Sequence, residues 1–184
     1  MARSGSSVNI ARKSAWSRVR PSYRLWIGFG LIALIGLLGQ TPKSFFWVQA
    51  IWPHAALWGA VGWASAGLSV RPMIMLCMLG VAQDISFDGP IGVFWLVNLA
   101  TYGLAAQLGE TFDVETDAVR ALMVAAVSMA AGFIVLWFLA SGTANHGVRV
   151  IPRIQEWGLT LVLFLPLAPI FRLGGRPGER IGAA

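Results

Sequence analysis

The chain has few of the residues that most metal proteins and disulfide-rich proteins use. Its 184 residues include one cysteine and two histidines. Cys77 therefore cannot form an intramolecular disulfide, and a cluster of soft metal ligands is excluded. His54 and His146 each stand apart from other residues at ligand spacing, so we expect two polar loop or interface residues and no metal site.

The sequence patterns of common catalytic sites are missing as well. A glycine-rich phosphate loop followed by lysine is absent, which argues against nucleotide hydrolysis. An intramembrane serine protease needs a Gly-x-Ser-Gly setting and a histidine on another helix. Ser141 precedes Gly142 but has Leu139 where the first glycine belongs, and Ser65 fails similarly. The sequence therefore predicts no enzyme, no catalytic residue and no cofactor.

Charged residues are scarce and long apolar runs recur along the chain. Charged side chains make up 12% and apolar ones 57% of the residues, with a mean hydropathy of +0.68. A membrane-spanning helix needs about 20 mostly apolar residues, and continuous runs favour helices over the alternating strands of a barrel. We therefore predict an all-α polytopic membrane protein with about six transmembrane helices, at 25–39, 54–70, 73–87, 91–108, 119–140 and 157–171.

Basic residues gather near both ends of the chain. The predicted domains are a basic flexible tail at 1–24, a transmembrane bundle at 25–172 and a short basic tail at 173–184. Cationic segments stay in the cytoplasm, so we expect an even number of spans in a bacterial inner membrane and both termini cytoplasmic. The cations predicted to meet anionic lipid or a partner are Arg12, Lys13, Arg18, Arg20, Arg24, Arg172 and Arg176. Nucleic acid is the less favoured partner of this tail.

Small residues indicate where helices approach one another, because close backbone packing drives helix association in lipid. They are Gly59, Gly62 and Ala66 in one predicted helix and Ala125, Ser128 and Gly132 in another. Internal bundle packing is the favoured interpretation, with a homodimer seam as the alternative.

An acidic residue inside an apolar segment is the sharpest local feature. Asp84 is expected to face the bundle about one turn below the outer surface, because an exposed charge in a membrane is costly. Its candidate partners are the Trp95 indole, Asn98 and the free N–H groups that begin the next helix. Transport of protons or cations is one role for such an acid, and holding two helices in register is the favoured one.

The surroundings of Asp84 suggest a helical hairpin with a polar stripe. Asp88 or Gly89 is suited to the N-cap of the second helix and Pro90 to its first turn. The stripe consists of Gln83, Asn98, Thr101 and Tyr102, which either line a ligand cavity or pack inward.

The hairpin resembles the signature of the rod shape-determining protein MreD family. The resemblance is carried by Gly80, Asp84, Pro90, Ile91 and Gly92. Trp63, the Arg71-Pro72 pair, Pro166 and Arg172 agree with it, so that it covers nearly the whole chain after residue 24. Gln83 is a departure, because the family more often has an apolar residue there.

The resemblance implies a non-enzymatic scaffold of the bacterial cell-elongation (rod) complex. The implied partners are MreC, the MreB filament, and the glycosyltransferase and transpeptidase that build lateral-wall peptidoglycan for cell-shape maintenance. The implied fold is similar to the substrate-binding subunits of energy-coupling-factor vitamin transporters, which supply the alternative function. Short outer loops and the lack of a dense polar set favour the scaffold.

Overall fold

The protein is a bundle of six helices in the part of the chain that the structure describes. This computed structural model describes residues 20–39, 44–45, 48–49, 52–86, 91–112, 118–143 and 150–173. The helices are α1 (Pro21–Leu38), α2 (Ala55–Ala64), α3 (Val70–Ser86), α4 (Val93–Phe112), α5 (Ala118–Thr143) and α6 (Val150–Phe171). Two strands, β1 (Ser44–Phe45) and β2 (Val48–Gln49), pair antiparallel between α1 and α2. The predicted all-α class is thus confirmed for the described residues, apart from these two short strands.

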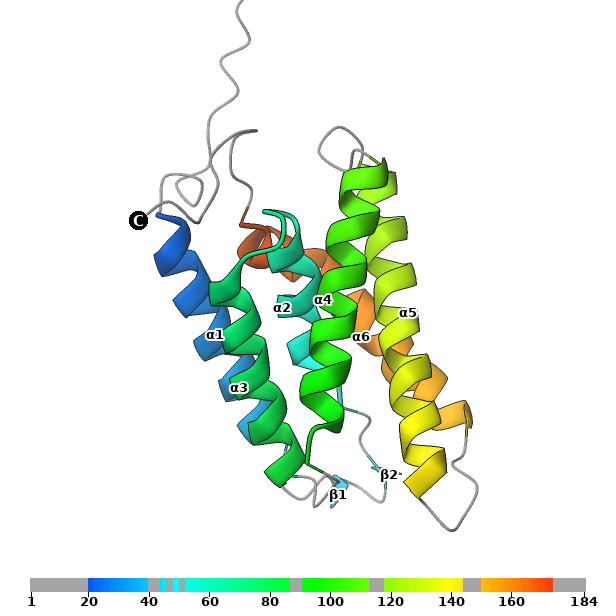
Figure 1. The fold of residues 1–184 in the computed structure, drawn as a ribbon. Coiled ribbons are helices and arrows are strands. Elements are labelled where there is room, and N and C mark those ends of the chain that lie inside the picture. Colours follow the sequence, from blue (N-terminus) through cyan, green and yellow to red (C-terminus); the bar gives the residue numbers. More distant parts are fainter. Residues whose placement is uncertain are drawn as a thin grey trace, which may run out of the picture.

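Successive helices run in alternating directions along the bundle (Figure 1). One end of the bundle holds the start of α1 and the end of α6, and we call it the terminal end. The other end holds the end of α3 and the start of α4, and we call it the hairpin end. Helices that follow each other in sequence therefore carry the chain from one end to the other each time.

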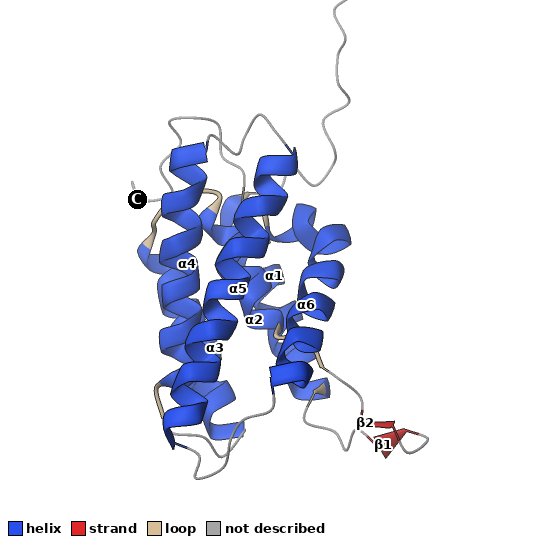
Figure 2. Ribbon diagram, turned by 90° about the vertical axis from the view of Figure 1, so that its right-hand side faces the viewer, coloured by secondary structure: helices blue, strands red, loops and turns tan. Residues whose placement is uncertain are grey.

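The central helix of the bundle is α2, and it is much shorter than predicted. Instead of 54–70 it covers Ala55–Ala64, or 10 residues, which is about 15 Å of helix and half of a hydrocarbon core. All of its residues are buried, and it contacts every other helix. Both views place it inside the bundle (Figures 1 and 2). The predicted second span is therefore corrected to a short enclosed helix.

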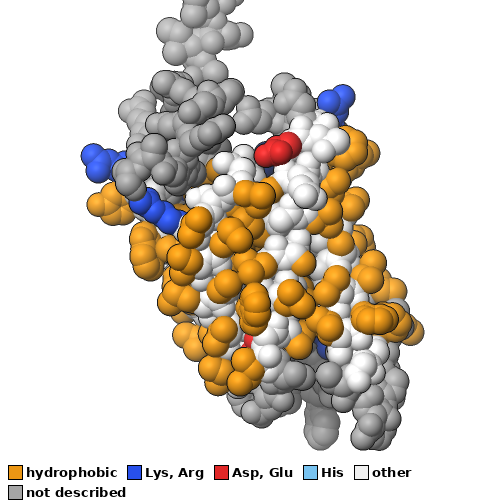
Figure 3. All heavy atoms as spheres, viewed as in Figure 1, with side chains coloured by type: hydrophobic (Ala, Val, Ile, Leu, Met, Phe, Trp, Pro, Cys, Tyr) orange, Lys and Arg blue, Asp and Glu red, His pale blue; other side chains and the backbone are white. Residues whose placement is uncertain are grey.

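Three helices are long and apolar enough to cross a membrane, namely α1, α5 and α6. Their outward side chains are apolar; examples are Trp26, Leu34, Met123, Phe138 and Val162. On the face shown in Figure 3, hydrophobic side chains cover the middle of the bundle, and Lys and Arg side chains stand mainly at the upper, terminal end. This distribution of apolar and charged side chains is compatible with a membrane around the middle of the bundle.

Several predicted helix boundaries were wrong because prolines and charges were read as breaks. Arg71 and Pro72 lie in the first turn of α3, and α6 begins at Val150 rather than at 157, with Pro152 in its first turn. The first N–H groups of a helix have no intrahelical partner, so proline is tolerated there. Pro166 and Pro169 also leave α6 helical as far as Phe171, so its last turns are not unwound.

The limits of the two predicted tails shift in the same way. α1 begins at Pro21, so residues 21–24 belong to this helix and not to a tail. Leu173, expected to begin the second tail, is buried.

Two further helices are longer than predicted. α4 continues to Phe112 rather than ending at 108, and α5 covers Ala118–Thr143 rather than 119–140.

Small residues pack inside the bundle, between helices of the same chain. A Cβ atom on Gly62 would overlap Phe171 of α6, including its backbone, and one on Gly59 would approach Ile32 Cδ1 of α1 to 2.7 Å. A Cβ atom on Gly132 of α5 would overlap the Thr101 hydroxyl of α4. Ala125 and Ser128 are also buried, whereas Ala66 lies beyond the end of α2 and is half-buried. These buried residues serve packing within the bundle.

The contact at Gly62 predicts a selective loss of stability. Gly62→Ala places a methyl group against the backbone of Phe171, and we expect it to lower the free energy of unfolding by about 1–3 kcal/mol. Gly30→Ala is the matched control, because a Cβ atom there meets nothing within 4 Å. Thermal unfolding of both variants in detergent measures the difference. Equal melting temperatures would contradict the close approach of α2 and α6.

Candidate functional site

Direct backbone contact between α3 and α4 occurs at Gly80. A Cβ atom on Gly80 would overlap the backbone N and Cα of Trp95. Any larger residue would push the two helices apart, so glycine is required by this close approach. The first residue of the predicted hairpin motif therefore sets the distance between its two helices.

Asp84 lies one turn further along the same face of α3 and binds the start of α4. Its side chain is 1% exposed. Gly92 N–H donates to Asp84 Oδ2 at 2.7 Å, and Phe94 N–H donates to Asp84 Oδ1 at 2.9 Å. These N–H groups have no partner within α4, and the positive end of a helix dipole favours an anion. Of the partners foreseen for Asp84, the free N–H groups are the ones it binds, rather than Trp95 or Asn98.

Gly92 provides the backbone conformation that this capping arrangement needs. Its φ is +110°, a region that L side chains rarely adopt, and its carbonyl accepts the N–H of Leu96 at 3.1 Å. It is therefore the N-terminal capping position of α4, with Asp84 supplying the side-chain oxygen from the neighbouring helix. The predicted turn residues Asp88, Gly89 and Pro90 lie outside the described residues.

The three polar-stripe residues that lie on α4 face inward, but each makes a different contact. Asn98, Thr101 and Tyr102 are each 1% exposed. Tyr102 donates its hydroxyl to Gly67 O at 3.0 Å and accepts the N–H of Ser69 at 2.8 Å, which fixes the connection from α2 to α3. Thr101 packs against Gly132 with no hydrogen-bond partner among the described residues. Of the three α4 residues, Asn98 lines a cavity, as does Gln83 of α3.

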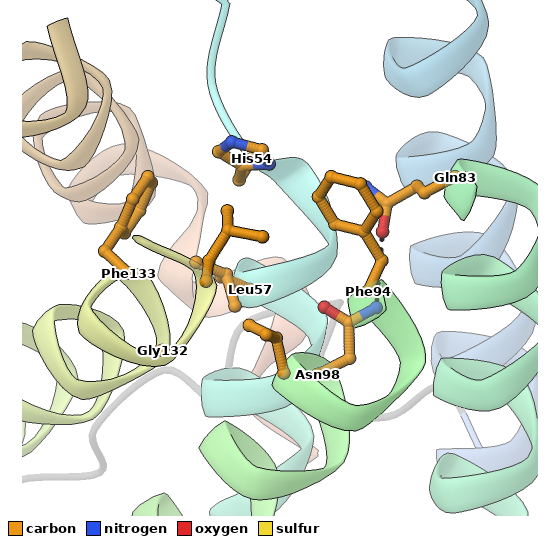
Figure 4. Close-up of a pocket in the computed structure, with 9 residues that line it drawn as sticks. His54, Leu57, Gln83, Phe94, Asn98, Gly132 and Phe133 are labelled. Atoms are coloured by element: carbon orange, nitrogen blue, oxygen red, sulfur yellow. Dashed lines mark hydrogen bonds between the residues drawn. The ribbon is translucent and has the colours of Figure 1, made fainter. Parts of the chain in front are cut away.

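An internal pocket lies between α2, α3, α4 and α5 (Figure 4). Its polar lining is His54, Gln83 and Asn98, and Asn98 Nδ2 donates to Gln83 Oε1 at 3.3 Å. The remaining walls are apolar and are formed by Leu57, Phe94, Val97, Gly132, Phe133 and Leu136. The cavity volume is about 10 Å³. That is room for about one water molecule, whereas pockets for drug-sized ligands measure about 300–1,000 Å³.

A charged cluster joins the rim of the pocket to α6, and sequence reasoning missed it. His54 Nε2 lies 3.6 Å from Glu156 Oε2, and Arg153 Nη1 donates to the same oxygen at 2.7 Å. Thr160 Oγ1 accepts the backbone N–H of His54 at 3.1 Å. The Arg153 to Glu156 spacing was a visible signal for an ion pair on one helix face, but nothing in the sequence pointed to His54. Among the described residues, no group of three His, Cys, Asp or Glu side chains forms a metal site.

The predicted surface cations fall into three groups, of which the buried Arg24 forms one by itself. Arg20 and Arg172 are exposed at the terminal end, together with Arg71 and Arg120. Arg12, Lys13, Arg18 and Arg176 lie outside the described residues.

Arg24 was expected at the membrane surface, but it is buried and holds the end of α6. It is 7% exposed and donates to the carbonyl oxygens of Pro169 at 3.4 Å, Leu173 at 3.5 Å, and Arg172. The last carbonyls of a helix have no intrahelical partner, so a guanidinium from α1 supplies what they lack. This role replaces the predicted one.

Comparison of the chain with protein-family models, curated proteins and solved structures finds no match.

The Arg24 contacts predict that its removal loosens the end of α6. Arg24→Met keeps the length of the side chain but leaves several buried carbonyl groups unpaired, so we expect a loss of about 2 kcal/mol. Arg20→Met removes an exposed cation one turn earlier and should change little. Unfolding in detergent compares the two variants. An equal loss of stability in the two variants would contradict the role of the Arg24 hydrogen bonds and leave its positive charge as its contribution.

The Asp84 contacts predict a specific weakening of the α3–α4 hairpin. Asp84→Asn replaces one acceptor oxygen by an N–H₂ group that faces a backbone donor, so we expect a loss of about 1–3 kcal/mol. Ser86→Ala is the control, because its exposed hydroxyl donates to Ala82 O within its own helix. The free energy of unfolding and amide exchange at Gly92 and Phe94 provide the measurements. Unchanged exchange in Asp84→Asn would contradict the capping role.

Proposed function

We propose that the chain is a non-enzymatic scaffold subunit of the bacterial cell-elongation complex, as its resemblance to the MreD family implies. The observation that carries the proposal is the construction of the α3–α4 hairpin. Gly80, Asp84 and Gly92 carry the sequence resemblance, and the same residues lock α3 onto the start of α4. A rigid hairpin offers a constant surface to partner proteins, which is what a scaffold requires.

The proposed arrangement has six crossings of the bacterial inner membrane. Support comes from the alternating directions of the helices and from the apolar outer faces of α1, α5 and α6 (Figures 1 and 3). α3 and α4 lie alongside these helices, and α2 crosses with the help of the short segments before and after it. A short helix at membrane depth is tolerated when it is enclosed by protein, as α2 is.

The proposed orientation places both termini in the cytoplasm. The described cations Arg20, Arg24, Arg71, Arg120 and Arg172 lie at the terminal end, and Arg153 lies at the hairpin end. Arg153 is paired with Glu156, so the difference in positive charge between the two ends is large. The positive-inside rule then assigns the terminal end to the cytoplasm.

The proposed partners meet different parts of this surface. Membrane spans of MreC and of the glycosyltransferase and transpeptidase pack on the apolar outer faces of the bundle. The exposed arginines Arg20, Arg71, Arg120 and Arg172 face anionic lipid or an acidic surface near the MreB filament. Asp84 acts by holding the hairpin in shape and not by carrying protons, since backbone N–H groups occupy both of its oxygens.

The size of the pocket speaks against the alternative, a vitamin-binding transporter subunit. A vitamin needs space in the usual range of about 300–1,000 Å³. The cavity volume of about 10 Å³ is far smaller, and among the described residues its polar lining consists of His54, Gln83 and Asn98.

Affinity purification of the tagged full chain from native membranes in mild detergent tests the scaffold role. We expect mass spectrometry to recover MreC and the wall synthases with the wild type and with Ser86→Ala, and much less of them with Asp84→Asn. Recovery of paired ATPases and a bound vitamin would overturn the proposal. A substrate-coupled proton flux that is lost in Asp84→Asn would overturn it as well.

A further inference from the structure

Two prolines lie inside the last helix of the bundle, and each removes a backbone hydrogen bond. Pro166 and Pro169 are in the interior of α6, and the helix continues past them to Phe171. A regular helix pairs each carbonyl with the N–H four residues later, and proline has no N–H. The carbonyls of Val162 and Leu165 therefore lack their intrahelical donors.

These two carbonyls lie on the face of α6 that points out of the bundle. Val162 and Leu165 are 61% and 50% exposed, and Pro166 and Pro169 are exposed as well. A helix carbonyl points along the axis toward the residue four positions later, so a carbonyl between two exposed residues lies on their face. α6 packs on α1, α2 and α5 with its other side, and Figure 2 shows it at the edge of the bundle.

No described side chain of this chain replaces the missing donors. Thr160 is the only residue of α6 with a side-chain hydroxyl, and it donates to Glu156 O one turn earlier. The hydrogen bonds described for Arg24 go to carbonyls from Pro169 onward. The other N–H groups in these turns each have their own carbonyl within the helix. The outward face of α6 therefore presents two acceptors that need a donor from elsewhere.

The depth of these acceptors excludes lipid as the donor, a step that rests on the proposed membrane arrangement. Val162 lies about 15 Å along the helix axis from the exposed Arg172 at the terminal end, which is half of a hydrocarbon core about 30 Å thick. Acyl chains have no hydrogen-bond donors, and an unpaired carbonyl is costly there. The donor must therefore come from protein.

A second copy of this chain does not supply that donor from its described surface. On α1, α3, α4, α5 and α6, exposed side chains that can donate lie within about two turns of a helix end; examples are Trp26, Gln107 and Trp137. None of them reaches the middle of α6 in a neighbouring copy. The missing donor therefore points to a different protein.

We infer that the outward face of α6 is a docking surface for a membrane-spanning helix of another protein, which carries a hydroxyl or amide side chain near its middle. That side chain donates to Val162 O and Leu165 O, and a side-chain amide has two N–H groups to serve both. A Cβ atom on Gly158 would meet nothing within 4 Å, so the partner backbone has room to come close on the same face.

Photo-crosslinking of the full chain in native membranes tests this inference. A photo-reactive amino acid replaces Val162, and mass spectrometry identifies the crosslinked peptide. We expect a membrane-spanning segment of another protein that has a hydroxyl or amide side chain within about one turn of the crosslinked residue. Adducts with lipid only, with a second copy of this chain, or with a span that lacks such a side chain would overturn the inference.

Proline variants assign the docking to the free carbonyls. Pro166→Ala combined with Pro169→Ala restores both N–H groups, so we expect the crosslinking yield to fall about fivefold or more while the melting temperature in detergent does not fall. Pro152→Ala is the matched control, because Pro152 is an exposed proline in the first turn of α6, where an N–H has no intrahelical partner. Its yield should stay within about twofold of the wild type. An unchanged yield in the double variant would overturn the inference.

A second pair of variants keeps the prolines and covers the face instead. Leu165→Trp places a bulky ring beside the two carbonyls, and we expect it to lower the yield at the Val162 probe about fivefold or more. Ile134→Trp is its control, because Ile134 is 63% exposed on α5 and should leave the yield unchanged. If the double proline variant does not fold, this pair decides, and equal yields overturn the inference.

The outcomes separate this inference from the scaffold role. A captured span from a protein outside the elongation complex supports the docking surface and contradicts the proposed partners. Recovery of the elongation proteins without any crosslink at Val162 places them on another face, which overturns the docking surface and leaves the scaffold role intact.

Discussion

Backbone groups at the ends of helices need partners inside an apolar bundle, and in this protein side chains from neighbouring helices provide them. Asp84 of α3 accepts the first N–H groups of α4, and Arg24 of α1 donates to the last carbonyls of α6. Tyr102 of α4 binds both sides of the α2–α3 connection, and Thr160 of α6 accepts the N–H of His54 before α2. Unpaired backbone groups cost several kcal/mol in hydrocarbon, so these contacts make a short buried helix such as α2 possible.

The same contacts determine what the bundle is suited to do. Polar side chains that satisfy the backbone are not free for proton transfer, and they join the helices into one body with apolar outer faces. Such a body fits a scaffold that partner helices recognise by shape.

Sequence reasoning succeeded where the signal is local. An acid inside an apolar segment indicated that Asp84 holds two helices in register, and the free N–H groups of the next helix were among its foreseen partners. It failed for Arg24, which was grouped with the basic tail because its charge suggested water. It also failed for His54, whose partner Glu156 belongs to the last helix. Such pairings depend on which helices become neighbours, and no local pattern encodes that.

The sequence by itself determined that the chain forms apolar helices, because composition and continuous hydrophobic runs depend only on which residues are present. It also determined where charge accumulates and which acid must be buried. Only the tertiary structure decided that α2 is a short central helix, that Arg24 holds the end of α6, and that His54 lies beside Glu156. The physical reason is that side chains of one helix satisfy the backbone groups of another only after packing has brought distant segments together.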